Sequence, residues 1–548
     1  MISKYKKVVI LFVLSALCLF SQSGLQAQSI SIIPAPKEII AGKEYFILDP
    51  QLSISYHAEA QKTASILQDH IKHAFGYQVE SIKSEESGTG IIQFKLDSRL
   101  AKEAYELHVS KTGIQIIASN NTGWFYGVQS LIQLFSVQQG STESKASIRI
   151  PELSIKDAPR FAWRALMLDE ARYFKGTEQV KMLLDEMALL KMNVFHWHLT
   201  DDQGWRIEIK KYPLLTEIAS KRKSTQVGEW NSPIQSAEAH EGYYSQEEIR
   251  EIVSYASERH INIVPEIEMP GHSSAAIAAY PWLGTAKKQI EVPIVFGVGK
   301  DVYDVSDPKV YLFLTDVLDE VMELFPSKVI HIGGDEVKYD HWKASASVNA
   351  YMEEKGLATP AELQVFFTNS ISQYLQGKGR RMMGWNEIMG HNIHEYQDKE
   401  DTKSTQSLAK ETIVHFWKGD VNLANEAARS GFDIVNSLHE YTYLDYDYGQ
   451  IPLSMAYAFE PVPVDLDPQY HDKVIGSGCQ MWGEWIPSNG HMHFQVFPRI
   501  AAYAELGWTE SQNKDFDRFK SALPKLQKRW EHRGIYYAPD SVVDKVSE

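Results

Sequence analysis

Eight short apolar segments restrict the fold of this chain more than any other feature. They follow residue 161, and the stretches between them have the spacing of amphipathic helices. The predicted strands are 165–168, 194–199, 261–267, 329–332, 381–385, 413–417, 432–435 and 474–482. Helices are predicted over 180–190, 309–325, 361–375 and 494–506. Since eight strands alternating with helices can close on themselves, the sequence predicts an α/β fold, a (β/α)8 TIM barrel.

The residues before the barrel predict a small α/β (α+β) domain. Segments 105–109 and 113–118 read as strands, and 123–135 has helical spacing. The stretch 138–151 is rich in Ser, Gln and Thr and ends on a proline, which predicts a loop near a boundary. We therefore expect an N-terminal domain over 28–157 and the barrel with a C-terminal helical tail over 158–548.

The first 27 residues have the order of a secretory signal peptide. Lysines at positions 4, 6 and 7 precede an apolar run over 8–20, which is too short for a confident membrane span. Only Cys479 remains after residue 27, so no intrachain disulfide is expected, and the single sequon at Asn120 also favours a bacterial envelope. We expect an exported protein without a membrane span, periplasmic or extracellular. The oligomeric state is left open.

The charge of the chain argues against several partners. Its formal net charge is -16, and removing three lysines with the predicted signal peptide makes it -19. A protein this acidic is a poor candidate for binding nucleic acid or an anionic membrane surface. A neutral substrate is expected instead.

Polar and aromatic residues collect after the predicted barrel strands. The active site of such a barrel lies at the C-terminal ends of its strands. In strand order the residues there are Asp169 and Arg172, Asp201 and Asp202, Glu268 and His272, Asp335 and Glu336, Trp385 and Glu387, Trp417, Tyr443 and Asp445, and Trp482 and Glu484. Acids, an arginine and three tryptophans around one rim predict a carbohydrate pocket, because aromatic faces pack on sugar C–H surfaces.

The acid pair Asp335–Glu336 is the strongest candidate for chemistry. It ends the segment 331–337, His-Ile-Gly-Gly-Asp-Glu-Val, whose glycines allow a tight turn and close approach of a ligand. Neighbouring carboxylates push their pKa values apart, so one can stay ionised while the other holds a proton. Taken alone, this motif is more often a simple acidic turn, but its position at the end of the fourth strand favours an active site.

Six motifs together resemble the β-N-acetylhexosaminidases of glycoside hydrolase family 20. They are Leu-Asp-Glu-Ala-Arg (168–172), Asn-Val-Phe-His-Trp-His-Leu-Thr-Asp-Asp (193–202), Pro-Gly-His (270–272), segment 331–337, Tyr-Leu-Asp (443–445) and Met-Trp-Gly-Glu (481–484). The resemblance covers the whole barrel, and the N-terminal domain is similar to the small domain that precedes it in that family. It implies an enzyme without a cofactor or metal that removes terminal non-reducing β-linked N-acetylglucosamine or N-acetylgalactosamine.

The resemblance also implies a substrate-assisted mechanism. The 2-acetamido group of the sugar is the nucleophile, so the enzyme needs no nucleophilic carboxylate. Glu336 is expected to be the general acid and base, and an ionised Asp335 to orient the acetamido N–H. The residues expected to bind substrate are Arg172, Asp201, His272, Trp385, Trp417, Tyr443, Asp445, Trp482 and Glu484. Among these, the tryptophans would wall the sugar, Tyr443 would donate to the acetamido oxygen, and Asp201 with His272 would support the acid.

Two other functions remain open from the residues. His196 and His198 have the spacing of a metal-binding pair and, with His272 and Asp335, could form a zinc-type hydrolase site. A non-catalytic secreted glycan-binding protein on the same scaffold is the second alternative. The sequence does not separate glucosaminide from galactosaminide substrates. Segment 390–410 is charged and unmatched, and we expect it to form a loop on the aglycone side.

Overall fold

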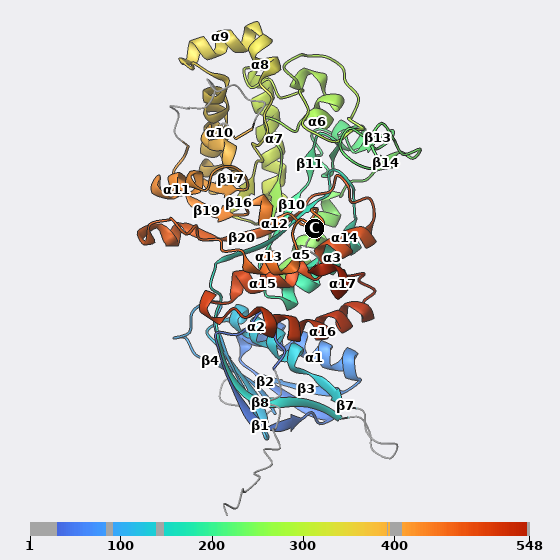
Figure 1. Ribbon diagram of the computed structural model, residues 1–548, viewed down its shortest axis with the longest axis vertical. Helices are drawn as coiled ribbons and strands as arrows, with labels where there is room; N and C mark the ends of the chain where they lie inside the picture. Colours follow the sequence, from blue (N-terminus) through green and yellow to red (C-terminus); the bar gives the residue numbers. More distant parts are fainter. Residues whose placement is uncertain (1–29, 84–90, 139–146, 392, 395–407, 545–548) are drawn as a thin grey trace, which may run out of the picture. The chain divides into compact units, whose positions relative to one another are not determined.

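A closed barrel of parallel strands organises the second part of the chain (Figure 1). The computed structural model describes residues 30–83, 91–138, 147–391, 393–394 and 408–544, so the predicted signal peptide lies outside the described residues. The barrel strands are β9 (Trp163–Asp169), β10 (Val194–His198), β15 (Asn262–Glu266), β16 (Val329–His331), β17 (Arg381–Trp385), β18 (Ile413–Phe416), β19 (Asp433–Asn436) and β20 (Val474–Met481). All eight predicted strands are confirmed, with ends that differ by at most two residues.

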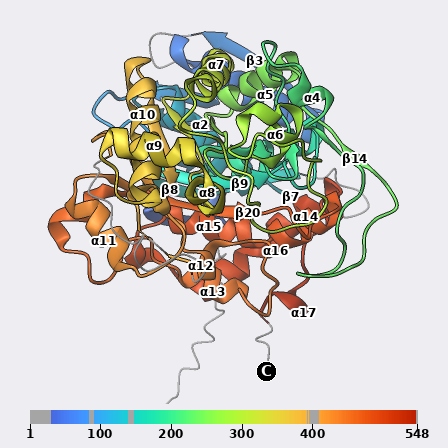
Figure 2. The ribbon, with the colours of Figure 1, turned by 90° about the horizontal axis from the view of Figure 1, so that it is seen from above.

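Helices surround this barrel in chain order. They are α3 (Thr177–Leu189), α4 (Leu214–Glu217), α5 (Gln246–Glu258), α6 (Ser274–Ala279), α7 (Pro308–Leu324), α8 (Asp340–Ala344), α9 (Ala346–Lys355), α10 (Pro360–Gly377), α11 (Asn422–Arg429), α12 (His439–Thr442), α13 (Leu453–Ala458), α14 (Asn489–Val496), α15 (Arg499–Trp508), α16 (Phe516–His532) and α17 (Asp540–Val543). Figure 2 shows α5, α7 and α10 along the outside of the barrel, and the Tyr374 hydroxyl of α10 donates to Asp319 of α7 over 2.7 Å. None of the described helices is long and apolar enough to cross a membrane.

One predicted helix is wrong in its extent. The helix expected over 494–506 is two helices, α14 and α15, which meet at Phe497 and Pro498. Proline has no backbone N–H and disfavours helical geometry in the residue before it, so the apolar periodicity continues across a break in the backbone.

A separate mixed sheet precedes the barrel. Its described strands are β1 (Glu38–Ile47), β2 (Gln51–Tyr56), β3 (Gln78–Lys83), β4 (Ile92–Leu96), β5 (Tyr105–Ser110), β6 (Gly113–Ala118), β7 (Ser136–Gln138) and β8 (Ser147–Asp157). The order is β1-β8-β5-β6-β4-β2-β3, with β7 paired to β8, and the helices are α1 (Gln61–Phe75) and α2 (Asn121–Leu134). The loop predicted over 138–151 is wrong from residue 147 onward, because Ile148 and Ile150 are buried on alternate positions of β8.

Alternate residues of the barrel strands form layers inside the barrel. The lowest layer is apolar and contains Trp163, Ala165, Val194, Val264, Val329, Met383, Ile413 and Val435. Two residues further along the same strands stand His196, Glu266, His331, Trp385 and His415, all buried. Because side chains two apart on a strand share a face, the sequence changes from an apolar core to a polar layer toward the C-terminal ends of the strands.

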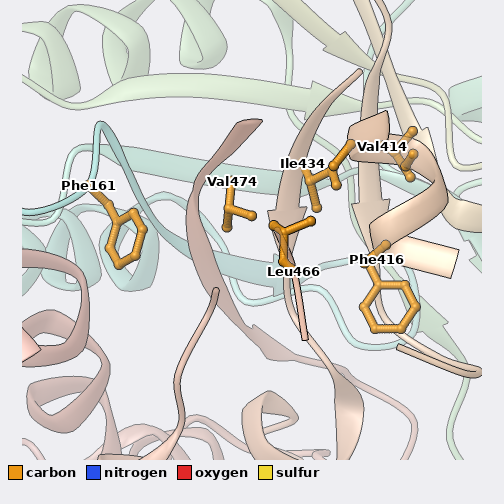
Figure 3. Close-up of a cluster of buried hydrophobic side chains, with 9 residues drawn as sticks. Phe161, Val414, Phe416, Ile434, Leu466 and Val474 are labelled. Carbon is orange, nitrogen blue, oxygen red and sulfur yellow. The ribbon is translucent and has the colours of Figure 1, made fainter. Parts of the chain in front are cut away.

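The outside of the barrel has its own apolar core. Val414 and Phe416 of β18 point away from the interior and pack with Ile434, Leu466 and Val474 (Figure 3). Phe161 and three alanines of α11 complete this cluster. Small alanine side chains let α11 approach the strands closely, which holds the sixth and seventh strands in place.

Gly476 gives a stability prediction at the closure of the barrel. It has a φ of 152° and pairs with Trp163 of β9, and a Cβ at this position would lie 1.9 Å from the Trp163 carbonyl oxygen. We expect Gly476→Ala to lower the free energy of unfolding by about 2–4 kcal/mol, because the backbone must move. Gly490→Ala is the control, since its Cβ meets nothing within 4 Å and alanine favours the helix. Equal denaturation midpoints for Gly476→Ala and the wild type would contradict this account.

Candidate active site

The acid pair lies on a strained turn after β16. Gly333 and Gly334 have φ values of 65° and 88°, and Glu336 has a φ of 51°, which is uncommon for a residue with a side chain. A Cβ on Gly333 would lie 1.7 Å from the Glu268 carboxyl oxygen. The turn therefore requires glycine at 333, and it presents Asp335 and Glu336 side by side at the C-terminal end of the barrel.

His272 lies between the two acids. Its Nε2 is 3.7 Å from Asp335 Oδ2 and 3.7 Å from Glu336 Oε2. On its other side, Nδ1 is 3.0 Å from Asp201 Oδ1 and 3.4 Å from Asp202 Oδ2. Burial lowers the pKa of His272, but the Asp201 and Asp335 carboxylates outweigh burial and raise it well above its usual range. His272 is thus a buried cation in contact with the acid pair.

The pKa values of the two acids move in opposite directions. Burial and the nearby Glu268 carboxylate raise the pKa of Asp335 well above its usual range. Burial also raises the pKa of Glu336, but His272, His394 and Lys418 outweigh it, so the net shift is downward. The protein groups alone therefore favour a neutral Asp335 and an ionised Glu336, the reverse of the expectation from sequence. A substrate N–H that donates to Asp335 would lower the pKa of Asp335. A substrate group that covers Glu336 would raise the pKa of Glu336.

Four aromatic rings form a box beside the acids. Ring centroids are 5.9 Å apart for Trp385 and Trp482, 5.9 Å for Tyr443 and Trp482, 6.0 Å for Trp417 and Tyr443, and 6.3 Å for Trp385 and Trp417. The rings come from four different strand ends, and each contacts the next. Burial raises the pKa of Tyr443 well above its usual range, so its hydroxyl stays protonated as a donor. The box can enclose a small flat apolar group such as an acetyl methyl.

Arg172 lies among a set of carboxylates beside the Trp482 ring. Its guanidinium is 2.9 Å from Asp201, 3.1 Å from Asp169 and 3.6 Å from Glu484. Its carbon lies 5.4 Å from the centre of the Trp482 ring. These contacts fix the arginine in one orientation, with its charge balanced by acids.

Asp445 completes the polar side of the pocket. Burial and the charge of Glu484 raise its pKa to about 8, and its Oδ1 is buried without a hydrogen-bond partner among the described residues. Asp335 Oδ1 is also buried and unpartnered there. A buried polar atom without a partner is costly, so these two oxygens are available to accept from a ligand.

Beneath the pocket, Glu266 holds the base of the aromatic box. Its carboxylate accepts from the Trp385 indole N–H at 2.8 Å and contacts His331 at 2.9 Å and His196 at 2.8 Å. His331 in turn contacts His415 at 3.3 Å. His331 is completely buried and contacts Glu266 and His415, so it has a structural position in this network.

The two histidines of the zinc alternative belong to different groups of possible metal ligands. His196 groups with Glu266 and His331, whereas His198 groups with Glu266 and Glu268. Among the described residues, the grouping that includes Asp335 is His272, Asp335 and Glu336, without either histidine of the pair. The strand that carries His196 and His198 thus points both side chains inward, but it does not bring them together with His272 and Asp335 as one ligand set.

No function is predicted from the sequence for several residues that the structure places in the site. Asp169 and Gln203 hold Arg172, and Glu266 holds Trp385. Glu387 and His394 contact each other and the acid site. Asp169 and Glu387 carry a signal, since both follow barrel strands, but His394 has none. It belongs to segment 390–410, of which residues 392 and 395–407 lie outside the described residues, so the expectation of an aglycone loop stays a prediction.

Glu268 gives a prediction for the pH dependence of stability. Burial and the charge of Glu266 raise its pKa from 4.5 to about 8, so the folded protein holds a proton that the unfolded chain has released. Its contribution to stability is complete below pH 4.5 and is lost as the pH rises through 8. In the wild type, this titration should make the free energy of unfolding fall by up to about 1.4 kcal/mol per pH unit between pH 6.5 and 8. We expect Glu268→Gln to lack this part of the fall. Denaturant titrations across this window measure it, and the exposed Glu229→Gln is the control. Unchanged pH dependence in Glu268→Gln would refute the shift.

Comparison with known proteins finds relatives of both parts of this chain. Residues 161–511 match the model of "Glycosyl hydrolase family 20, catalytic domain", and residues 29–158 match "Glycosyl hydrolase family 20, domain 2". The chain is 36% identical over 540 residues to a beta-hexosaminidase of Porphyromonas gingivalis, covering 94% of this chain and 66% of that protein. It is 35% identical over 496 residues to a beta-hexosaminidase of Vibrio furnissii, covering 88% and 77%.

One solved structure has a similar fold. It is the exo β-N-acetylglucosaminidase of Vibrio harveyi in complex with N-acetylglucosamine, with a TM-score of 0.79 and 31% identity. The match covers 94% of this chain and 79% of that one. At this identity and coverage, the likeness includes both the barrel and the preceding sheet.

Proposed function

The chain belongs to glycosyl hydrolase family 20, and from this premise we propose that it is an exo-acting, retaining β-N-acetylhexosaminidase. Its substrate is a glycan with a terminal non-reducing β-linked N-acetylglucosamine or N-acetylgalactosamine. Glu336 is the general acid and base, and Asp335 orients the 2-acetamido group. The chain spans 66% of the length of the Porphyromonas gingivalis relative, so this activity is proposed for the residues present here.

One observation carries the proposal: two adjacent carboxyls stand beside a closed aromatic box. Retaining glycosidases with an enzyme nucleophile place two carboxyls about 5 Å apart on opposite sides of the bond. Asp335 and Glu336 share one turn and one partner, His272, so they approach the sugar from the same side. The box supplies the missing element, because it can hold an acetamido group as the internal nucleophile.

The reaction proceeds in two steps. The acetamido carbonyl oxygen attacks the anomeric carbon as Glu336 donates its proton to the leaving oxygen, and an oxazolinium-like intermediate forms. Asp335 accepts the acetamido N–H and stabilises the positive charge that develops on that group. The Tyr443 hydroxyl donates to the carbonyl oxygen and aims it. Water then attacks the anomeric carbon and displaces the acetamido oxygen, which restores the acetamido group. Glu336 takes the proton of the water, and the β configuration is retained.

The remaining site residues bind the terminal sugar. Arg172 donates to the 3- and 4-hydroxyls, and Asp445 and Glu484 contact further hydroxyls. The unpartnered Oδ1 of Asp445 supports this assignment, since a sugar hydroxyl is a suitable donor. Trp385, Trp417 and Trp482 wall the acetyl group and the ring, while Asp201 orients His272.

We further propose that the protein is exported. The predicted signal peptide over 1–27 and the bacterial relatives support a periplasmic or extracellular location. The proposed division is an N-terminal domain over 28–157 and the catalytic barrel with its helical tail over 158–548.

Release of nitrophenol from its β-N-acetylglucosaminide and β-N-acetylgalactosaminide tests the activity. Turnover of either substrate is expected, with retention of configuration in the first-formed sugar. Binding of N-acetylglucosamine without any turnover would instead establish the non-catalytic alternative. A panel of oligosaccharides capped or free at the non-reducing end tests exo action, because only free ends should be cleaved.

A further inference from the structure

A second histidine–carboxylate pair contacts Glu336. His394 Nε2 is 2.9 Å from Glu387 Oε1, and His394 Nδ1 is 3.6 Å from Glu336 Oε1. His394 is 6% exposed and Glu387 is 3% exposed, so both are buried against the site. A carboxylate on one ring nitrogen of a buried histidine fixes the orientation of the ring and favours a proton on that nitrogen.

The two oxygens of Glu336 face different pairs. His272, held by Asp201 at 3.0 Å, lies 3.7 Å from Oε2, whereas His394, held by Glu387, faces Oε1. Asp201 and His272 follow the second and third barrel strands, whereas Glu387 and His394 follow the fifth. Each oxygen of the acid therefore has its own imidazole, and each imidazole has its own carboxylate.

Glu387 also connects this pair to the aromatic box. Its Oε2 accepts from the Trp417 indole N–H at 2.9 Å, while its Oε1 contacts His394. One buried carboxylate thus fixes both a wall of the box and the partner of the acid. Because the same group holds both, the position of Glu336 relative to the acetamido pocket depends on Glu387.

We propose that His394, held by Glu387, is a positioning residue that sets the protonation of Glu336 and orients Oε1 toward the leaving oxygen. This inference rests on the proposed role of Glu336 as acid and base. In its protonated form the His394 imidazole, 3.6 Å from Oε1, favours the carboxylate form of Glu336, which suits the second step, in which Glu336 must act as a base. The same positive charge lowers the pH at which Glu336 releases its proton.

Other charged groups also face Glu336. Lys418 and His272 favour its ionised form, and Lys338 lies in its field. Asp335 opposes ionisation when it is itself charged. No step of the mechanism uses His394, so its replacement changes the balance of charges around Glu336 without removing a group that touches the substrate.

His394→Gln separates charge from structure. Glutamine can still donate to Glu387 but cannot become a cation, so the pKa of Glu336 should rise. Since Glu336 must be protonated to donate, we expect the alkaline limb of kcat/KM to move up by about 0.5–1 pH unit, with KM nearly unchanged. His391→Gln is the matched control, because His391 lies on the same segment but contacts Glu426 at 3.3 Å.

Leaving groups provide a second readout. A weaker acid at position 336 should slow substrates with poor leaving groups by about 2- to 10-fold at pH 5 and leave a dinitrophenyl substrate unchanged. Glu387→Gln should reproduce both effects and should also raise KM through Trp417. If His394→Gln lowers kcat equally at every pH and for every leaving group, its role is structural and the inference is overturned.

Glu336→Gln separates this inference from the proposed function. If that variant keeps the alkaline limb, the limb does not belong to Glu336 and the proposed function fails. If it loses the limb while His394→Gln leaves it unmoved, only the inference about His394 is overturned. Thermal midpoints of all four variants exclude unfolding as the cause, and Glu387→Gln decides the question where His394→Gln does not fold.

Discussion

Replacing Glu336 by glutamine is expected to lower kcat for a nitrophenyl β-N-acetylglucosaminide by about 10³-fold, which is about 4 kcal/mol of transition-state stabilisation. Glutamine preserves the size of the side chain and can donate a hydrogen bond, but it cannot transfer a proton. Binding of N-acetylglucosamine should stay within a few fold of the wild type, because the aromatic box and Arg172 are unchanged.

The size of this loss should depend on the leaving group. A dinitrophenol leaves without protonation, so its substrate should retain far more activity than a disaccharide. Steady-state kinetics with both substrates measure the difference, and the exposed Glu229→Gln is a control for the change of charge. Wild-type turnover of a disaccharide by Glu336→Gln would remove this residue from the acid role.

Replacing Asp335 by asparagine is expected to lower kcat/KM by about 10²- to 10³-fold. The charge of Asp335 is needed only when the acetamido nitrogen becomes positive, so most of the loss should appear in kcat. Asparagine also presents an N–H₂ group or a neutral oxygen where the acetamido N–H requires an anion. The effect should persist with a dinitrophenyl leaving group, unlike that of Glu336→Gln, because it acts on the nucleophile.

A thiazoline analogue of the intermediate tests the same step directly. It should inhibit the wild type competitively and much more tightly than N-acetylglucosamine does, since it resembles the transition state. Asp335→Asn should lose most of this extra affinity, whereas the affinity for N-acetylglucosamine should change little. Absence of inhibition in the wild type would argue against substrate assistance and for an enzyme nucleophile.

The pKa directions connect these two predictions. With protein groups alone, Asp335 tends to be neutral and Glu336 tends to be ionised. The proposed mechanism needs the opposite arrangement, so we expect the substrate to shift the proton balance through its acetamido N–H and its leaving group. We infer that binding and protonation are coupled in this site, and Asp335→Asn should therefore also move the acidic limb of the kcat profile.

The barrel and the members of the pocket could be predicted because they follow from order along the chain. Strand ends of a (β/α)8 barrel meet at one rim, so residues such as Arg172, Trp385 and Glu484 can be assigned to the pocket without coordinates. Two predictions were wrong, in places where the residue pattern or composition does not reflect the backbone conformation. Pro498 divides a helix that the periodicity predicts as continuous, and β8 begins within a stretch whose composition predicts a loop.

The sequence by itself determined the fold, the strand that carries the acid pair, and the residue types around the rim. Tertiary structure decided which of these groups touch, and therefore their charge states. Glu268 against Gly333, and His394 against Glu336, are contacts between segments far apart in the chain. A pKa depends on burial and on distances of a few ångströms to other charges, and neither is a property of sequence order. For this reason the adjacency of Asp335 and Glu336 can be read from the sequence, but the balance of protons between them cannot.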